Sequence, residues 1–229
     1  FGQGCLERGM VKATYGTGSS IMMNIGEIPA YSSRVVTSLA WSMGGKVHYV
    51  LEGNINYTGA VISWLKNDLH LIDDPGEPQH LAEPANPQDT TYLVPAFTGL
   101  GAPYWDSDAK AAIVGMGRTT GKAELVKAAV ESIAYQIHDV VDTMQQESGI
   151  PIAQLRVDGG PTKNQYLMQF QSDISAIPVS VPSDEERSGI GAAYAAGIGA
   201  GLYRKEELFS DTGRTIYRPT MEEPVRKEK

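Results

Sequence analysis

The stretch over residues 123–146 constrains the fold of this chain more than any other feature of its sequence. Apolar residues recur in it at intervals of three or four, at Val126, Val130, Ile133, Ile137, Val140 and Met144. This spacing predicts one α-helix with a single apolar stripe, about 35 Å long at the usual rise per residue. Such a helix can cross a whole sheet, so we interpret the stripe as core and not as a cofactor site.

The sequence before this helix is rich in β-strand signals, and the sequence after it alternates between strand and helix. Three strands are expected over residues 13–26, 34–43 and 46–53, and Gly44-Gly45 marks a hairpin between the last two. The other expected elements are a helix at 56–71, a surface loop at 73–89, a strand at 91–97, an irregular loop at 98–110 and a possible strand at 111–114. Beyond the long helix we expect a strand at 155–157, a helix from Thr162, a strand at 177–182 and a helix at 188–203.

This order predicts an α/β domain with a mixed sheet, an antiparallel meander first and parallel βα units after it. A Rossmann domain is excluded because its glycine loop follows the first strand, and the Gly189-x-Gly191 pair here lies inside the last helix. A P-loop is excluded because no Gly-Lys-Ser/Thr sequence occurs.

A Gly-Gly turn follows the strand at 155–157 and precedes a helix. Gly159 and Gly160 remove both side chains where a flat ligand could lie against bare backbone, and the positive end of the helix favours phosphate. Thr162 is expected to cap this helix, with Gln165 completing a capping box. Many α/β connections use glycine only for turning, so this stretch alone leaves both a nucleotide site and a plain turn open.

A second set of small residues interrupts the first expected strand, at Gly16, Thr17 and Gly18. Either another group approaches the backbone there, or the glycines mark a β-bulge, and the stretch alone favours the bulge.

Composition excludes several classes of protein. The formal net charge of -8, without a Lys/Arg cluster, disfavours a nucleic-acid surface, and the single cysteine, Cys5, rules out an internal disulfide. No apolar run approaches the roughly 18 residues of a membrane span, and no signal peptide is present, so a cytoplasmic location is expected. The chain starts at Phe1, within a segment expected to be helical over residues 1–8, which suggests a piece of a longer protein.

Several blocks, taken together and in order, resemble the FGGY family of carbohydrate kinases, and within it they are most similar to the glycerol kinases. The blocks are FGQGCLERGMVKATYGTG, YVLEGNINYTGAVISWL, LVPAFTGLGAPYWD, AVESIAYQIHDVVDTM and RVDGGPTKNQYLMQFQSDI, and they run from Phe1 to about Tyr203 with the family's signature around Ala111. The resemblance implies a ribonuclease-H-like, actin-like ATPase fold. It also implies that residues 1–229 form the C-terminal, nucleotide-binding domain of a two-domain kinase whose N-terminal domain is absent.

The resemblance also implies positions for the ligands. Gly160 and Asn164 fall where the family holds the adenine nucleotide, and Gly59 falls on another nucleotide contact. Thr17, with Gly18, falls on a phosphate turn, where a hydroxyl and backbone amides surround phosphate oxygens. ATP or ADP with Mg²⁺ would be the cofactors, a polyol or sugar the substrate, and a homodimer or homotetramer is a possible assembly.

Three departures from the glycerol kinase pattern stand out. Ser63 replaces a nucleotide-contacting Gln, so that contact is shortened or lost. Ser20 replaces a Phe that lies against the carbon chain of the polyol, which suggests a larger or more hydroxylated substrate. The catalytic base of the family is an Asp upstream of the Phe-Gly-Gln motif at Phe1, so no catalytic residue is assigned within this chain, and the isolated chain is expected to be inactive.

The other acidic residues and the histidines are interpreted as structural. Asp158, Asp106 and Glu52 lie at strand ends or in a loop, where carboxylates commonly bond nearby backbone, and the histidines show no ligand spacing for zinc. Three alternatives stay open: a kinase for a pentulose or another polyol, a non-enzymatic actin-like nucleotide switch, and a degenerate paralogue that binds a sugar without phosphorylating it.

Overall fold

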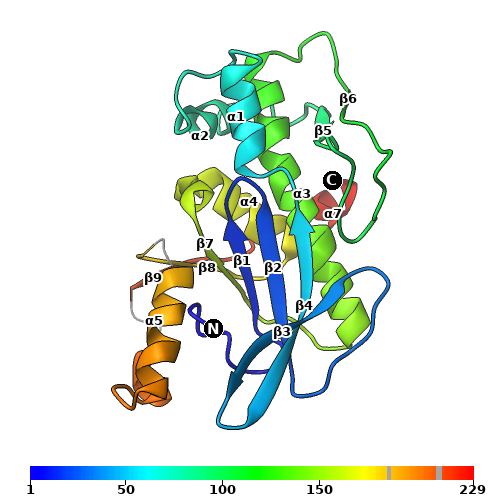
Figure 1. The fold of residues 1–229 in the computed structure, drawn as a ribbon. Helices are drawn as coiled ribbons and strands as arrows, with labels where there is room; N and C mark the ends of the chain where they lie inside the picture. The colour runs from blue at the N-terminus through cyan, green and yellow to red at the C-terminus, as the bar shows by residue number, and fades with distance from the viewer. Residues whose placement is uncertain (185–186, 210–212) are drawn as a thin grey trace.

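A seven-stranded mixed sheet forms the centre of the computed structural model, which describes residues 1–184, 187–209 and 213–229 (Figure 1). The strands lie in the order β3-β4-β2-β1-β7-β8-β9. Their bounds are β1 Val11–Tyr15, β2 Ser19–Gly26, β3 Val36–Met43, β4 Lys46–Ile55, β7 Leu155–Asp158, β8 Val179–Pro182 and β9 Arg214–Tyr217. β1 pairs antiparallel with β2 and parallel with β7, and β7 pairs parallel with β8, so the predicted change from antiparallel to parallel strands is confirmed.

The antiparallel part differs from a simple meander. The first expected strand, residues 13–26, is two strands joined by a tight turn at residues 16–18, so the bulge interpretation is wrong. β4 pairs with both β2 and β3, which places β3 at the edge. The reason is burial, because β4 carries Leu51 and Ile55 into the core and Gly53 lets Val140 approach, whereas β3 contributes no buried residue.

Helix α3, Lys122–Ser148, crosses one face of the sheet as predicted (Figure 1). All six residues of its apolar stripe have an exposed fraction of 0%. Helix α4, Gln165–Ser175, packs beside α3 on the same face. The core therefore lies between these two helices and the inward side chains of β1, β2, β4 and β7.

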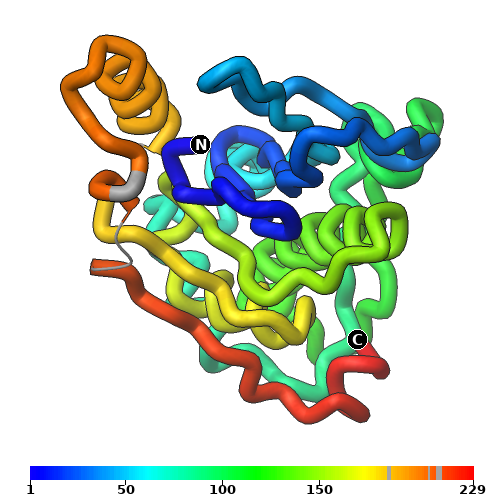
Figure 2. Tube along the Cα trace, turned by 90° about the horizontal axis from the view of Figure 1, so that it is seen from below, coloured from blue at the N-terminus to red at the C-terminus, as the bar shows by residue number. Residues whose placement is uncertain are grey.

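The opposite face of the sheet carries helix α5, Arg187–Gly199, and the N-terminal segment (Figure 2). The helix expected over residues 1–8 does not form. The backbone of Gly2 lies against α5 so closely that a Cβ on Gly2 would be 2.0 Å from the Arg187 carbonyl oxygen.

The elements between β4 and α3 lie at one end of the sheet (Figure 1). The helix expected over residues 56–71 is α1, Gly59–Asn67, and the surface loop at 73–89 contains a short helix that sequence reasoning missed, α2, Glu77–Ala82. The expected strands at 91–97 and 111–114 pair with each other as β5, Tyr92–Val94, and β6, Ala112–Val114, in a separate small sheet. The C-terminal region adds α6, Lys205–Leu208, and α7, Glu223–Glu228.

Among the residues that the structure describes, no helix combines the length and apolar character needed to cross a membrane.

Candidate nucleotide-binding site

A pocket of about 360 Å³ lies between α1 and the turn that leads into α4. Four residues predicted to bind nucleotide line it, namely Gly59, Ser63, Gly160 and Asn164. Its apolar surface comes from Ile62, Val130, Ile133, Leu167, Pro75 and Pro161, and its remaining polar lining from Lys66, Asn67 and Lys163. The fold thus brings together residues about a hundred positions apart around one apolar, partly cationic concavity, which is the usual form of a small-molecule site.

The two adjacent glycines of the turn serve different purposes. Gly159 has φ of 100°, and a Cβ there would lie 2.0 Å from the Tyr15 carbonyl oxygen, so this position requires glycine for packing of β7 against β1. Gly160 begins a short 3₁₀ turn, η1, Gly160–Lys163, and a Cβ there would meet nothing within 4 Å. Only Gly160 therefore leaves open space beside the backbone, and that space is the pocket.

The N-cap of α4 is Asn164, and the predicted cap at Thr162 with Gln165 is wrong. The 3₁₀ turn delays the start of the helix, and the Thr162 hydroxyl donates instead to the Gly159 carbonyl oxygen at 2.7 Å. Asn164 Oδ1 accepts from the Leu167 amide at 2.9 Å. The cap fixes the side chain with its NH₂ group as the part that can donate to a ligand in the pocket.

Gly59 and Ser63 lie one turn apart on α1. The amides of Gly59 and Ala60 donate to the carbonyl oxygens of Gly16 and Thr17 at 2.9 and 3.0 Å. A Cβ on Gly59 would be 2.8 Å from the Gly16 carbonyl oxygen, so a larger residue would push α1 away from the β1–β2 turn. Because these first amides of α1 already donate to carbonyl oxygens of the protein, the Gly59 amide is not available to a ligand. Gly59 can contact a ligand only by van der Waals contact with its backbone.

The β1–β2 turn carries Thr17 and Gly18 directly below the start of α1 (Figure 1). Gly18 is required by packing, because a Cβ there would lie 2.4 Å from the Ile55 carbonyl oxygen. The carbonyl oxygens of this turn face α1, and within the described part of the chain the amides of Thr17 and Gly18 reach no acceptor. Thr17 is exposed. The turn is not part of the pocket lining but lies next to it, and it offers a hydroxyl and two amides there.

Ser20 lies apart from these residues, on the face of β2 that points away from α3. Its hydroxyl accepts from Lys12 Nζ at 3.5 Å, and Lys12 Nζ also donates to Thr14 Oγ1 at 3.1 Å. The structure therefore separates the residue predicted to contact substrate from the pocket predicted to hold nucleotide.

Sequence reasoning missed Lys66, Lys163 and the apolar floor of the pocket. One signal for Lys66 was available, because Gly59, Ser63 and Lys66 follow at spacings of four and three and therefore share a helix face. The floor residues Val130 and Ile133 belong to the α3 stripe, and their double role in core and pocket has no sequence signal.

Asp106 and Asp158, both expected to be structural, differ in the hydrogen bonds that their carboxylates accept. Asp106 Oδ1 accepts from the amides of Asp108 and Ala109 at 2.9 and 3.0 Å, as a structural loop residue does. Asp158 is 2% exposed, and its Oδ1 accepts no hydrogen bond from any described residue. Among the side chains that the structure describes, no three from Asp, Glu, His or Cys are grouped to hold a metal ion.

The sequence is similar to that of a known family of proteins. The model of the C-terminal domain of the FGGY family of carbohydrate kinases matches residues 11–200. A glycerol kinase of Natranaerobius thermophilus is 48% identical over 209 residues, which cover 91% of this chain and 42% of that protein. A glycerol kinase of Streptococcus agalactiae serotype Ia is 47% identical over 232 residues, which cover 100% of this chain and 46% of that protein.

Solved structures of kinases superimpose on this chain. Plasmodium falciparum glycerol kinase with ADP superimposes with a TM-score of 0.91 at 36% identity, over 99% of this chain and 46% of that one. Xylulose kinase from Lactobacillus acidophilus, at 20% identity and a TM-score of 0.84 over the same shares, agrees in fold. The chain thus spans less than half the length of these relatives.

Proposed function

Because this chain belongs to the FGGY family of carbohydrate kinases and matches its C-terminal domain, we propose that the pocket between α1 and α4 binds ATP and ADP. The observation that carries the proposal is the convergence of Gly59, Ser63, Gly160 and Asn164 on one concavity of about 360 Å³. Gly160 leaves room for a planar group against bare backbone, and the NH₂ group of Asn164 can donate to it. Lys66 and Lys163 supply positive charge that suits phosphate.

The β1–β2 turn is proposed to hold the terminal phosphates. The Thr17 hydroxyl and the amides of Thr17 and Gly18 are donors on a glycine-flanked turn next to Gly59, and such donors stabilise charge that develops on phosphate oxygens. Mg²⁺ would accompany the nucleotide. Since the described residues contain no cluster of metal ligands, the ion would be held mainly by the phosphates, as Mg²⁺ commonly is.

We propose that residues 1–229 are the nucleotide-binding half of a larger kinase that transfers the γ-phosphate to an alcohol group. The names of the glycerol kinases reported above support this proposal. In that enzyme an N-terminal half would close over the cleft and exclude water. An Asp upstream of Phe1 would accept the proton of the attacking hydroxyl. The isolated chain is then expected to bind nucleotide without catalysing transfer, and a cytoplasmic location and a homodimer or homotetramer are part of the same proposal.

Calorimetric titration with ADP and Mg²⁺ tests the nucleotide site. We expect the parent chain to bind, Gly160→Val to lose binding, and Gly117→Val to bind as the parent does. Gly117 is a matched control, because a Cβ there also meets nothing within 4 Å but the residue lies outside the pocket. Equal binding by the parent and Gly160→Val would place the nucleotide elsewhere. If neither the chain nor the full-length protein binds ADP, the proposal is wrong.

Ser20 favours a second candidate, a kinase for a pentulose or another polyol. A hydroxyl in place of an aromatic ring enlarges and polarises the acceptor side of the site. Substrate profiling of the full-length enzyme decides between the two, since a ketopentose preferred over glycerol by orders of magnitude in kcat/KM would exclude the glycerol assignment.

A further inference from the structure

The nucleotide pocket has an outer wall that comes from the loop between α1 and β5. Residues 73–79, which we call the wall segment, follow the end of α1, and Pro75 lines the pocket. The wall segment lies between two buried anchors, Ile72 at 2% exposed and Ala82 at 1%, whereas residues 73–76 are exposed. The wall is therefore fixed at both ends and open to solvent along the part that borders the pocket.

One side chain of the wall segment reaches α4. Oε1 of Gln79 accepts a hydrogen bond from the backbone amide of Gln165 at 2.9 Å, and Nε2 of Gln79 donates to Glu83 Oε1 at 2.9 Å. The second bond fixes the orientation of the Gln79 amide, so that its oxygen faces α4. Gln165 is the first residue of α4 and follows Asn164, so the bond ends beside a proposed ligand contact.

Further hydrogen bonds of the wall segment are local. The Gly76 amide donates to Asp74 Oδ1 at 2.8 Å, and the Asp73 amide donates to Glu77 Oε2 at 3.2 Å. These bonds shape the segment but do not join it to α4. Among the described residues, the bond from Gln165 to Gln79 is the one hydrogen bond that does so.

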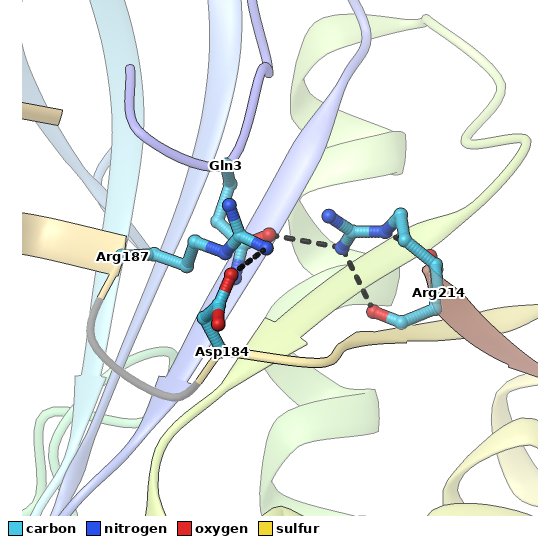
Figure 3. Close-up of polar contacts among 5 residues, drawn as sticks. Gln3, Asp184, Arg187 and Arg214 are labelled. Carbon is cyan, nitrogen blue, oxygen red and sulfur yellow. Dashed lines mark hydrogen bonds and ion pairs between the residues drawn. The ribbon is translucent and has the colours of Figure 1, made fainter. Parts of the chain in front are cut away.

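A contact on the opposite face of the sheet is built with more bonds. The Arg214 guanidinium there donates to Gln3 Oε1 at 2.9 Å (Figure 3). It also donates to Ser180 Oγ at 2.6 Å and to the Ser180 carbonyl oxygen at 3.1 Å, so the loss of one bond leaves others in place. The wall segment depends on a single exposed bond to α4, which can break and re-form while the rest of the fold stays intact.

The wall segment lies at the end of the pocket away from the phosphate turn. The Gly59 amide donates to the β1–β2 turn, whereas Lys66 lies seven residues further along α1, about 10 Å at the usual rise per residue. The wall segment follows this far end of α1 (Figure 1). A nucleotide with its terminal phosphates at Thr17 would therefore place its nucleoside against Pro75.

We propose that Gln79 is a positioning residue that holds Pro75 against the nucleoside and so slows the release of nucleotide. This inference rests on the proposed nucleotide site and adds the residue that controls exchange at that site. The bond to Gln165 forms before nucleotide arrives, so binding does not have to order the wall segment. Without the bond the segment becomes ordered only on binding, and the bound nucleotide leaves more readily.

The test is stopped-flow displacement of N-methylanthraniloyl-ADP, with Mg²⁺, from the full-length protein by excess ADP. We expect Gln79→Met to raise the dissociation rate constant about three- to tenfold and to change the association rate constant less than twofold. Methionine keeps the length and helix propensity of glutamine but removes the amide oxygen. Gln79→Glu keeps an acceptor oxygen and should retain slow release. Gln88→Met is the control, because Gln88 is an exposed glutamine of the same loop outside the pocket lining.

A second variant removes the donor of the same hydrogen bond. Gln165→Pro deletes the amide hydrogen at the first helical position, where proline is well tolerated. Asn164 already has the extended backbone of a residue before proline, with φ of -76° and ψ of 102°. Gln165→Pro should speed release as Gln79→Met does, and the double variant should release nucleotide no faster than either single variant, because both remove one bond.

Three results would each overturn the inference. They are release by Gln79→Met at the parent's rate, release by Gln79→Glu as fast as by Gln79→Met, and additive effects of Gln79→Met and Gln165→Pro in the double variant. Any of these in a full-length protein that binds ADP leaves the proposed function intact. A full-length protein that binds no ADP refutes the proposed nucleotide site and this inference together.

Discussion

The hydroxyl of Tyr15 donates to Oε1 of Gln171 at 2.9 Å, and both residues have an exposed fraction of 0%. Tyr15 ends β1, directly before the turn proposed to hold phosphate, and Gln171 lies in α4, after the Gly-Gly turn. Gln171 Nε2 in turn donates to the Ala134 carbonyl oxygen and to Ser175 Oγ. One buried hydrogen bond therefore links the strand that leads into the first turn with the helix that follows the second.

Tyr15→Phe should lower the free energy of unfolding by about 1–2 kcal/mol, because the Gln171 oxygen would be left buried without a donor. Urea denaturation of the chain measures this. Tyr31→Phe is the matched control, since Tyr31 is 95% exposed and its substitution should change stability little. Equal stability of the parent and Tyr15→Phe would show that the hydrogen bond contributes nothing.

Gly159→Ala and Gly160→Ala should differ strongly although the residues are adjacent. Gly159→Ala places a Cβ 2.0 Å from the Tyr15 carbonyl oxygen at a φ of 100°, and should lower the free energy of unfolding by about 2 kcal/mol or more. Gly160→Ala meets open space and should leave stability nearly unchanged. Thermal unfolding of both variants checks this, and a similar loss in each would contradict the separate roles assigned to them.

Asn164 combines a cap with a proposed ligand contact, and two variants separate these roles. Asn164→Asp keeps the acceptor for the Leu167 amide and should retain stability, but it replaces the NH₂ donor with a negative charge and should weaken ADP binding. Asn164→Ala should weaken binding and also lose about 1 kcal/mol of stability. Denaturation and calorimetry on the same samples give both values. An Asn164→Asp variant that binds ADP like the parent would remove Asn164 from the nucleotide site.

Tyr104 should titrate abnormally. Partial burial of its ring, together with its hydrogen bond to Asp139 Oδ2 at 2.8 Å, raises the pKa of Tyr104 to about 12. In the unfolded chain a tyrosine ionises near 10, so the free energy of unfolding should fall as pH rises from about 10 to about 12. Ultraviolet difference titration should show this pKa move towards its ordinary value in Asp139→Asn. An unchanged titration in that variant would exclude Asp139 as a cause.

Some features of this protein could be predicted from local sequence. The α3 stripe follows a spacing that only one face of a helix can bury, and every residue in it is fully buried. The order of strands and helices gave the mixed sheet, and the ordered blocks gave the family. These signals succeed because periodicity and turn chemistry depend on neighbours within a few residues.

Other features depend on segments that are far apart in the chain. Short-range signals could not show that β4 rather than β3 lies beside β2, because that choice depends on packing against α3. They also placed the cap of α4 at Thr162, two residues early, because the intervening 3₁₀ turn is set by the contact of Gly159 with β1.

The sequence by itself determined the fold class, the kinase family and the Gly-Gly turn at Gly159 and Gly160. Only the tertiary structure decided that Gly159 packs against Tyr15 while Gly160 borders an open pocket, and that Ser20 lies beside Lys12 and not beside the nucleotide residues. The physical reason is that a residue's local conformation is encoded by its neighbours, whereas the groups it meets across the sheet are fixed by the register and packing of distant strands and helices.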